Sequence, residues 1–362
     1  MNENTINDRR TINDFKNKTF SKYSKNNVKK ELLKSLYDSS IEPGCNWSIE
    51  LICAGHFQDL WEIILLYMSR YIHLGNPKLP IYIEKRFQNF KTIIENGYLG
   101  NELALRNNEK IRKLFAEVIC ILCFSRKKHA FESLIIKDKN DFEITNLTKR
   151  LKAPNIKFAE LVFQKGDPKE LFIAINEFAY NISKQSRDIT AACYWLEWIL
   201  EFESICRQKK VLCRCERRTF IPVDSKYQMD IIWMIWQAII FEAKNNKETF
   251  YQKIIISLLN LFCIKYTSGC KKRRKYIIYY CISFFTENVD MNIKLVENKD
   301  LVENISNKIY LIYKEVKKNE ISPQTDYLFT GVERTNLDKT VEKLEKLEQL
   351  EQMNISKGTS PL

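Results

Sequence analysis

The sequence contains few glycines, prolines and histidines, and each shortage excludes a class of structure or site. Nine glycines and eight prolines among 362 residues argue against turn-dense all-β folds and against glycine-rich phosphate-binding loops. The histidines are His56, His73 and His129, and no Glu-x-x-His or HExxH pattern accompanies them. Walker loops, dinucleotide-binding glycine patterns and nucleophile elbows are also absent from the sequence. The sequence therefore favours a protein without enzymatic activity and predicts no cofactor.

Long apolar runs are missing as well. No run reaches the ~18 residues that a membrane-spanning helix requires, and the N-terminal MNENTINDRR lacks the apolar stretch of a secretory signal. Eleven cysteines are present, most of them within apolar helical patterns, where a free thiol behaves as a small hydrophobic group. We expect a soluble, non-secreted protein of a reducing intracellular compartment, the cytoplasm or the nucleus.

Apolar residues recur at helical spacing along most of the chain, and no segment shows the alternation typical of a strand. The predicted fold class is all-α: a multi-helix globular array or bundle, with an irregular helical repeat as the alternative. The helical patterns cover residues 28–37, 46–74 with an interruption at 55–56, 81–95, 109–124, 249–266, 276–285 and 299–318. The expected organisation is a disordered basic arm at 1–26, a helical body at 27–320 with a subdivision near 140–153 as an alternative, a linker at 321–335, a semi-detached helix at 336–353 and a tail at 354–362.

Several short segments predict where helices begin and end. Pro-Gly at 43–44 predicts a turn after the first helix, and Gly-Asn-Pro at 75–77 predicts a helix stop with the glycine in a left-handed cap. Asp-Pro-Lys-Glu at 167–170 fits an N-cap, a proline at N1 and a glutamate at N3. Further helices are predicted to begin at residues 188–190 and at 222–224.

The segment 191–218 stands at the centre of the sequence pattern. It begins as an almost wholly apolar helix, which predicts burial among other helices, and continues into a cluster of cysteines and cations. Glu197 and Glu201 interrupt the apolar surface on one helix face. They fit a thin solvated stripe or partners for lysine or arginine on a neighbouring helix. A di-metal centre is disfavoured because the Glu-x-x-His ligands of such centres are missing.

Positive charge is concentrated rather than spread. The net charge is +13, and three stretches account for it: residues 1–30 carry 8 cations and 3 anions, 207–218 carry 6 and 1, and 265–275 carry 6 and 0. Clusters of this kind favour a polyanionic partner such as nucleic acid. The candidate nucleic-acid-binding residues are Arg207, Lys209, Lys210, Arg214, Arg217, Arg218, Lys271, Lys272, Arg273, Arg274 and Lys275.

The basic run 271–275 has alternative interpretations. Tyr276, Tyr279 and Tyr280 follow it and would stack on bases if the run contacts nucleic acid. A run of five cations also fits a nuclear-import signal or a solvated corner between two helices.

Three cysteines, Cys206, Cys213 and Cys215, lie among the cations of the first cluster. With a fourth ligand they could bind zinc, but their spacing does not match a zinc knuckle, which begins with two cysteines separated by two to four residues. Nearby cations lower a thiol pKa, so a reactive cysteine is a second alternative. No metal site is predicted.

Two functions follow as hypotheses. The first is a non-enzymatic protein that binds a polyanion, most of all nucleic acid, through the basic clusters. The alternative is a structural or assembly scaffold that captures protein partners through the helix at 336–353. The sequence does not indicate an oligomeric state.

Three stretches carry a resemblance: HLGNPKLPIYIEKRF at 73–87, RKLFAEVICILCFSRKKHAFE at 112–132 and DPKELFIAINEFAY at 167–180. Together with the composition rich in Asn, Lys and Ile, they resemble uncharacterised proteins of large nucleocytoplasmic DNA viruses of protists. The resemblance implies an intracellular protein in or near a viral replication or assembly site. It carries no activity-bearing motif, so no residue role follows from it.

Overall fold

The computed structural model describes residues 5–136, 139–245 and 249–321. The chain divides into two units: residues 1–6 with 10–320, and residues 7–9 with 321–362. In the described part of the second unit, the Ile321 amide donates a hydrogen bond to the Asp8 carboxylate (3.0 Å). The predicted linker beyond Ile321, the predicted helix at 336–353 and the tail lie outside the described residues. Residues 10–320 belong to one unit, so no boundary between the two units falls near 140–153, the position of the alternative subdivision.

The all-α prediction is confirmed. The described residues contain no β-strand; the isolated bridge between Lys18 and Ser24 is not extended into one. The α-helices are α1 (Lys25–Tyr37), α2 (Ile41–Cys53), α3 (Phe57–Tyr67), α4 (Leu79–Glu95), α5 (Glu109–Phe124), α6 (Ile144–Thr148), α7 (Lys157–Glu160), α8 (Phe172–Ile182), α9 (Ile189–Gln208), α10 (Ile232–Asn245), α11 (Thr249–Phe262), α12 (Cys270–Thr286) and α13 (Lys299–Lys317). Shorter turns are η1 (Ile12–Phe15), η2 (Met68–Ile72), η3 (His73–Gly75), η4 (Glu102–Asn107), η5 (Lys139–Phe142), η6 (Lys169–Leu171) and η7 (Ser225–Tyr227).

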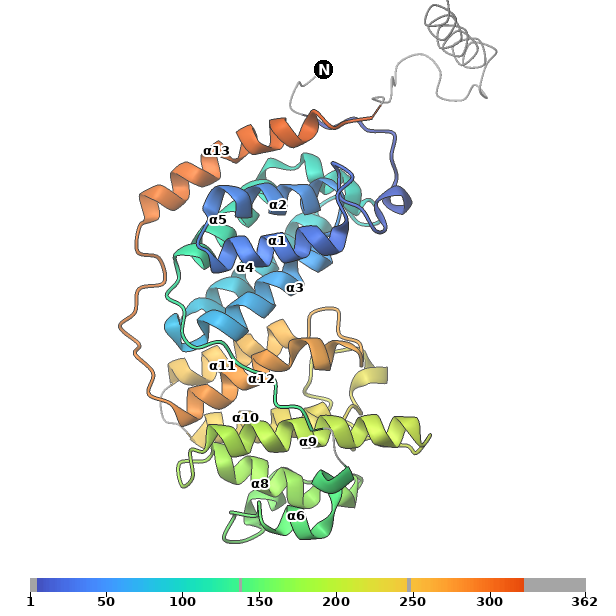
Figure 1. The fold of residues 1–362 in the computed structure, drawn as a ribbon, viewed down its shortest axis with the longest axis vertical. Coiled ribbons are helices and arrows are strands. Elements are labelled where there is room, and N and C mark those ends of the chain that lie inside the picture. The colour runs from blue at the N-terminus through green and yellow to red at the C-terminus, as the bar shows by residue number, and fades with distance from the viewer. Residues whose placement is uncertain (1–4, 137–138, 246–248, 322–362) are drawn as a thin grey trace, which may run out of the picture. The chain divides into compact units, whose positions relative to one another are not determined.

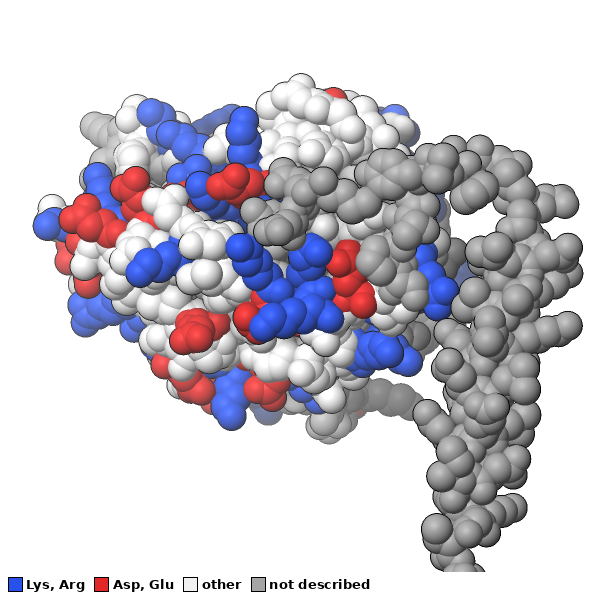
Figure 2. All heavy atoms as spheres, turned by 90° about the horizontal axis from the view of Figure 1, so that it is seen from above, with Lys and Arg blue, Asp and Glu red and all other residues white. Residues whose placement is uncertain are grey.

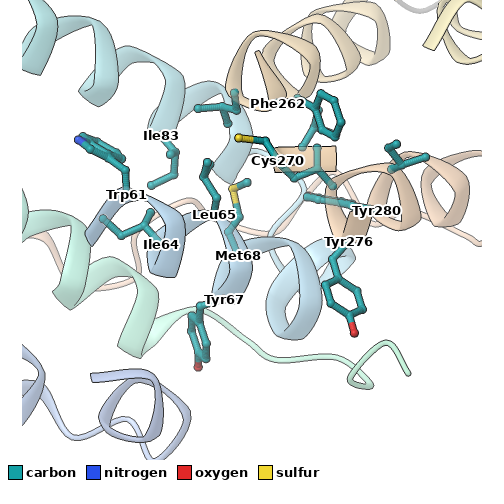
Figure 3. Packing of buried hydrophobic residues seen from close by; sticks show 14 of the residues in the cluster. Trp61, Ile64, Leu65, Tyr67, Met68, Ile83, Phe262, Cys270, Tyr276 and Tyr280 are labelled. Carbon is teal, nitrogen blue, oxygen red and sulfur yellow. The ribbon is translucent and has the colours of Figure 1, made fainter. Parts of the chain in front are cut away.

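Within the first unit, α11 and α12 lie between two groups of helices (Figure 1). One group contains α1 to α5 with α13 packed against α5 and α2, and the other contains α8, α9 and α10. Figure 3 shows the packing on the side of the first group, where Leu65 of α3 and Met68 of η2 lie beside Cys270 and Tyr280 of α12. One continuous hydrophobic core therefore joins helices that are about 200 residues apart in the sequence.

The N-terminal segment is part of this packing. Phe15 and Phe20 are buried, and the Arg10 guanidinium lies 4.9 Å and 4.5 Å from their ring centroids. The Ile6 amide donates to the Asn107 side chain (2.9 Å). The expectation of a disordered arm over residues 1–26 is therefore corrected for residues 5, 6 and 10–26, which the structure describes within the first unit. Their aromatic side chains are packed in the core, whereas a mobile arm would leave this apolar area in water.

Some predicted boundaries hold and others shift. Helix α5 has the predicted bounds, and Asp188 caps α9 by accepting from the Ala191 amide (2.9 Å). Pro43 and Gly44 make no turn; they lie in the first turn of α2, where proline is tolerated. Helix α10 begins at Ile232 rather than at 222–224.

Gly75 has a different role from the left-handed cap that its sequence context predicts. Its φ angle is not positive. Instead, a Cβ atom at this position would lie 2.0 Å from the Arg126 carbonyl oxygen. Glycine is required here because the backbone after α5 passes directly over η3.

No helix in the described ranges is at once long enough and apolar enough to cross a bilayer.

The buried His73 predicts a loss of stability in mild acid. Its Nε2 atom lies 2.7 Å from the His129 carbonyl oxygen, and its Nδ1 atom has no partner among the described residues. The pKa of His73 is lowered to about 4, mainly by burial. The His129 carbonyl and Glu287 oppose the shift, whereas the His129 ring and Lys128 add to it. An unfolded histidine takes up a proton near pH 6.5, so stability is retained above that pH and lost as the pH falls toward 4.

The expected loss from His73 is about 2–3 kcal/mol between pH 7 and about pH 4.5. Urea unfolding of the wild type and of His73→Gln at both pH values measures it. The variant should show a smaller difference between the two pH values, and His129→Gln serves as the control. An equal pH dependence in wild type and His73→Gln would contradict the prediction.

Candidate polyanion-binding surface

Helices α9 and α12 lie against each other in antiparallel order (Figure 1). Acidic and basic side chains pair along their contact. Glu197 of α9 pairs with Lys275 (2.6 Å), and Glu201 pairs with Lys272 (3.6 Å). The predicted ion-pair role of the two glutamates is therefore confirmed. In this antiparallel arrangement the C-terminal end of α9 lies beside the N-terminal end of α12. The two basic clusters therefore lie at the same end of this helix pair.

Lys271 was predicted to face solvent, but it is buried. Its side chain is 1% exposed, and Nζ contacts Glu203 (2.5 Å) and Asp230 (2.7 Å). The Tyr266 hydroxyl also donates to Asp230 (3.0 Å), and burial together with that carboxylate raises the pKa of Tyr266. A cation at the N-terminus of a helix opposes the helix dipole. The two carboxylates offset this cost, so Lys271 stabilises the fold rather than a ligand.

Arg274 and Lys275 are engaged in the same way. Arg274 is 3% exposed and pairs with Glu62 of α3 (2.6 Å), while its Nη1 donates to the carbonyl oxygens of Phe262 and Ile264. Lys275 is half-buried against Glu197. The prediction that the whole run 271–275 contacts phosphates is therefore wrong for Lys271 and Arg274, because binding would have to break buried ion pairs.

Arg218 is the third predicted nucleic-acid-binding residue that is buried instead of exposed. Its side chain is fully buried, and its guanidinium makes a bidentate pair with Asp167: Nη1 lies 2.9 Å and Nη2 lies 2.6 Å from the two carboxylate oxygens. Nε donates to Gln237 of α10 (2.6 Å). Asp167, predicted as a helix N-cap, instead accepts from Arg218 and from the amides of Gln164 and Glu216.

The acidic partners were not identified from the sequence. Glu62, Glu203 and Asp230 lie in largely apolar segments, and an acid in such a segment is the signal that could have found them. Their partners lie between 41 and 212 residues away along the chain, so the sequence alone does not give the pairing.

The other predicted cations remain at the surface. We call residues 207–217, which complete α9 and form the loop after it, the basic loop; its exposed cations are Arg207, Lys209, Lys210, Arg214 and Arg217. Lys272 and Arg273 are exposed at the nearby start of α12. Arg207 and Lys272 have surface partners at 3.2 Å and 3.6 Å, which contribute little. The described residues place no carboxylate oxygen within 4.0 Å of the side-chain nitrogens of the other five cations, which are Lys209, Lys210, Arg214, Arg217 and Arg273.

Charges are arranged differently on the end of the unit that carries α13. Figure 2 looks onto that end, and lysine, arginine and acidic side chains lie interspersed over the part not covered by grey atoms. A mixed surface of this kind produces little net field. The basic loop, with five cations and Glu216 as its one anion, differs from it in composition.

The cysteines of this region do not form a metal site. Burial, followed by the charge of Cys206, raises the pKa of the Cys213 thiol to about 12. Cys215 is buried, and its thiol donates to the Asp230 carbonyl oxygen (3.1 Å). Over the described ranges, no three histidine, cysteine, aspartate or glutamate side chains are grouped so that they could hold a metal ion.

Hollows lie elsewhere on the unit. An open groove of about 820 Å³ lies between α4, α5 and α13, and a pocket of about 540 Å³ has an aromatic wall that includes Trp61 and Phe87. Neither is lined by the basic loop.

Comparison with protein-family models, with curated proteins and with solved structures finds no match for this chain. The resemblance to proteins of large DNA viruses stays a prediction.

Proposed function

We propose that this protein binds a polyanion, nucleic acid in particular, through the basic loop, and that it does so without enzymatic chemistry. The observation that carries the proposal is the exposure of five cations within eleven residues. The single anion of the loop, Glu216, is engaged by the Gly166 amide (2.8 Å). Solvated cations can approach phosphates without breaking the buried ion pairs.

Lys272 and Arg273 extend the surface, because the start of α12 lies at the same end as the basic loop. The tyrosines once expected to stack on bases cannot do so: Tyr276, Tyr279 and Tyr280 are buried. Binding would therefore depend on charge rather than on base contacts, and it should show little sequence preference.

Removing four loop charges should lower both affinity and its dependence on salt. The variant replaces Lys209, Lys210, Arg214 and Arg217 by glutamine. Each lost phosphate contact lowers the slope of log K against log salt by about 0.9 on duplex DNA, so four contacts lower it by about 3–4. Fluorescence anisotropy with labelled single-stranded DNA, duplex DNA and RNA over a series of salt concentrations measures the slope.

The matched control removes the same number of charges elsewhere. Lys85 of α4 and three lysines of α13 are exposed, and all four are replaced by glutamine in the control: Lys85, Lys299, Lys308 and Lys314. The proposal fails if this control and the loop variant lose affinity equally, or if the wild type binds no nucleic acid at low salt.

The alternative function, an assembly scaffold, has one observation in its favour. Val211 and Leu212 at the tip of the basic loop are 58% and 74% exposed. An apolar tip among cations suits a protein surface with an apolar centre and acidic rim. The predicted docking element, the helix at 336–353, lies outside the described residues. Absence of nucleic-acid binding at low salt would turn the search to such a protein partner.

A further inference from the structure

Helices α3, α4 and α11 line the pocket of about 540 Å³, and its wall is aromatic. Phe57 and Trp61 come from α3, and Phe87 and Phe90 come from α4. The ring centroids of Trp61 and Phe87 lie 5.2 Å apart at 84°, and those of Trp61 and Phe90 lie 5.7 Å apart at 60°. These edge-to-face contacts hold the rings in fixed orientations. A hollow of this size accommodates a small organic molecule.

One face of α4 supplies both apolar and polar groups to the pocket. Glu84, Phe87, Gln88 and Lys91 have the spacing of a single helix face, and all four line the pocket. Side chains three residues apart on a helix are neighbours, with Cβ atoms about 5–6 Å apart. A molecule that contacts the Phe87 ring can therefore also contact the Glu84 carboxylate.

The cations that line the pocket already have acidic partners. They form the ion pairs Lys91–Glu95 (3.6 Å), Lys265–Glu102 (3.7 Å) and Arg274–Glu62 (2.6 Å). Glu84 differs from these carboxylates, because its partner is the neutral side-chain amide of Asn260 (2.6 Å). The described residues place no lysine, arginine or histidine nitrogen within 4.0 Å of the Glu84 oxygens. The pocket therefore has one carboxylate whose charge is not balanced.

We propose that this pocket binds a small organic cation, with an aromatic or other apolar body against the aromatic wall and an ammonium group beside Glu84. The inference goes beyond the proposed polyanion binding. It does not rest on that function, because the basic loop does not line the pocket.

The pocket favours positive charge in two ways. The faces of aromatic rings attract cations through their quadrupole. Glu84 is half-buried, and the attraction between opposite charges is stronger in such surroundings than in bulk water. A neutral ligand gains neither contribution, and a ligand with a carboxylate is repelled by Glu84. The expected preference for a cation over a neutral molecule of the same shape is about tenfold.

The test uses three probes that share a phenyl ring and a two-carbon chain: phenethylamine as the cation, 2-phenylethanol as the neutral molecule and 3-phenylpropionate as the anion. Ligand-observed NMR titration at neutral pH, with the full chain freed of nucleic acid, measures the dissociation constants. Phenethylamine should bind with a Kd of about 1 mM or lower, as expected for so few heavy atoms. The other two probes should bind about tenfold more weakly.

Two variants locate the site. Glu84→Gln removes the charge but keeps an oxygen that can accept from Asn260, and it should bind phenethylamine about tenfold more weakly without changing the affinity for 2-phenylethanol. Phe87→Leu keeps apolar volume but removes a ring face, so it should weaken phenethylamine binding by about threefold. Glu109→Gln is the matched control: Glu109 is exposed on α5, outside the pocket, and its replacement should leave the binding of all three probes unchanged.

The proposal is overturned if 2-phenylethanol or 3-phenylpropionate binds as tightly as phenethylamine, or if no probe binds at about 10 mM. It is also overturned if Glu84→Gln, shown to be folded by urea unfolding, binds phenethylamine as the wild type does. No nucleic acid enters this measurement, so its result is separate from that of the polyanion-binding experiment.

Discussion

Replacing Arg218 by methionine is expected to lower the free energy of unfolding by about 3–5 kcal/mol. The Arg218 and Asp167 side chains both have 0% exposure. Removing the guanidinium leaves the Asp167 carboxylate buried with only the amides of Gln164 and Glu216 as donors. Urea unfolding followed by tryptophan fluorescence measures the change, since the chain contains six tryptophans.

The neighbouring Arg217 supplies the matched control. It is exposed, so Arg217→Met should change the free energy of unfolding by no more than about 0.5 kcal/mol. Removing both charges, as in Arg218→Met with Asp167→Asn, should recover part of the loss, because the uncompensated charge is then gone. If Arg218→Met costs no more than Arg217→Met, Arg218 is not the buried residue described above.

The Arg218 pair also explains how the basic loop is held. The guanidinium joins the segment before α8, through Asp167, to α10, through Gln237. Nearby, the Cys215 amide donates to the Met229 carbonyl oxygen (3.0 Å). The base of the loop is thereby fixed, while the part that carries the exposed cations extends from it. We expect Arg218→Met to loosen the loop as well as to destabilise the fold.

Helices were predictable from sequence where an apolar stripe at helical spacing coincided with a local end signal. Helix α5, with its Asn108 cap, and α9, with its Asp188 cap, are the clearest cases. The start of α12 was missed by six residues because five consecutive cations give no apolar stripe. The burial of Lys271 and Arg274 depends on the carboxylates of Glu203, Asp230 and Glu62 from distant parts of the chain, which a local pattern does not show.

Asp167 shows how a tertiary interaction overrides a local signal. Its sequence context, Asp-Pro-Lys-Glu, matches a helix start, and η6 does begin at Lys169. The carboxylate nevertheless turns to Arg218, because a bidentate buried pair exceeds the ~1 kcal/mol that an N-cap contributes. The same reasoning applies to Lys271 and Arg274: identical residue types in one short run have opposite environments, and only the fold distinguishes them.

A comparable loss of stability, about 3–5 kcal/mol, is expected for Lys271→Met. Nζ of Lys271 is the cation shared by Glu203 and Asp230. Its removal leaves two carboxylates close together, with only the Tyr266 hydroxyl and the Ile232 amide as donors to Asp230. Lys272→Met, one residue along, should cost about 0.5 kcal/mol or less, since Lys272 is exposed. Urea unfolding of both variants measures the contrast, and equal costs would contradict it.

This contrast decides how binding at the start of α12 must be tested. Neutralising all five residues of 271–275 would remove two buried cations, so lost binding could come from unfolding alone. Replacing only Lys272 and Arg273 by glutamine leaves the buried pairs intact. If these two cations extend the binding surface, the double variant should keep the stability of the wild type and lower the salt slope on duplex DNA by about 2. An unchanged slope would confine the surface to the basic loop and assign the run 271–275 to folding.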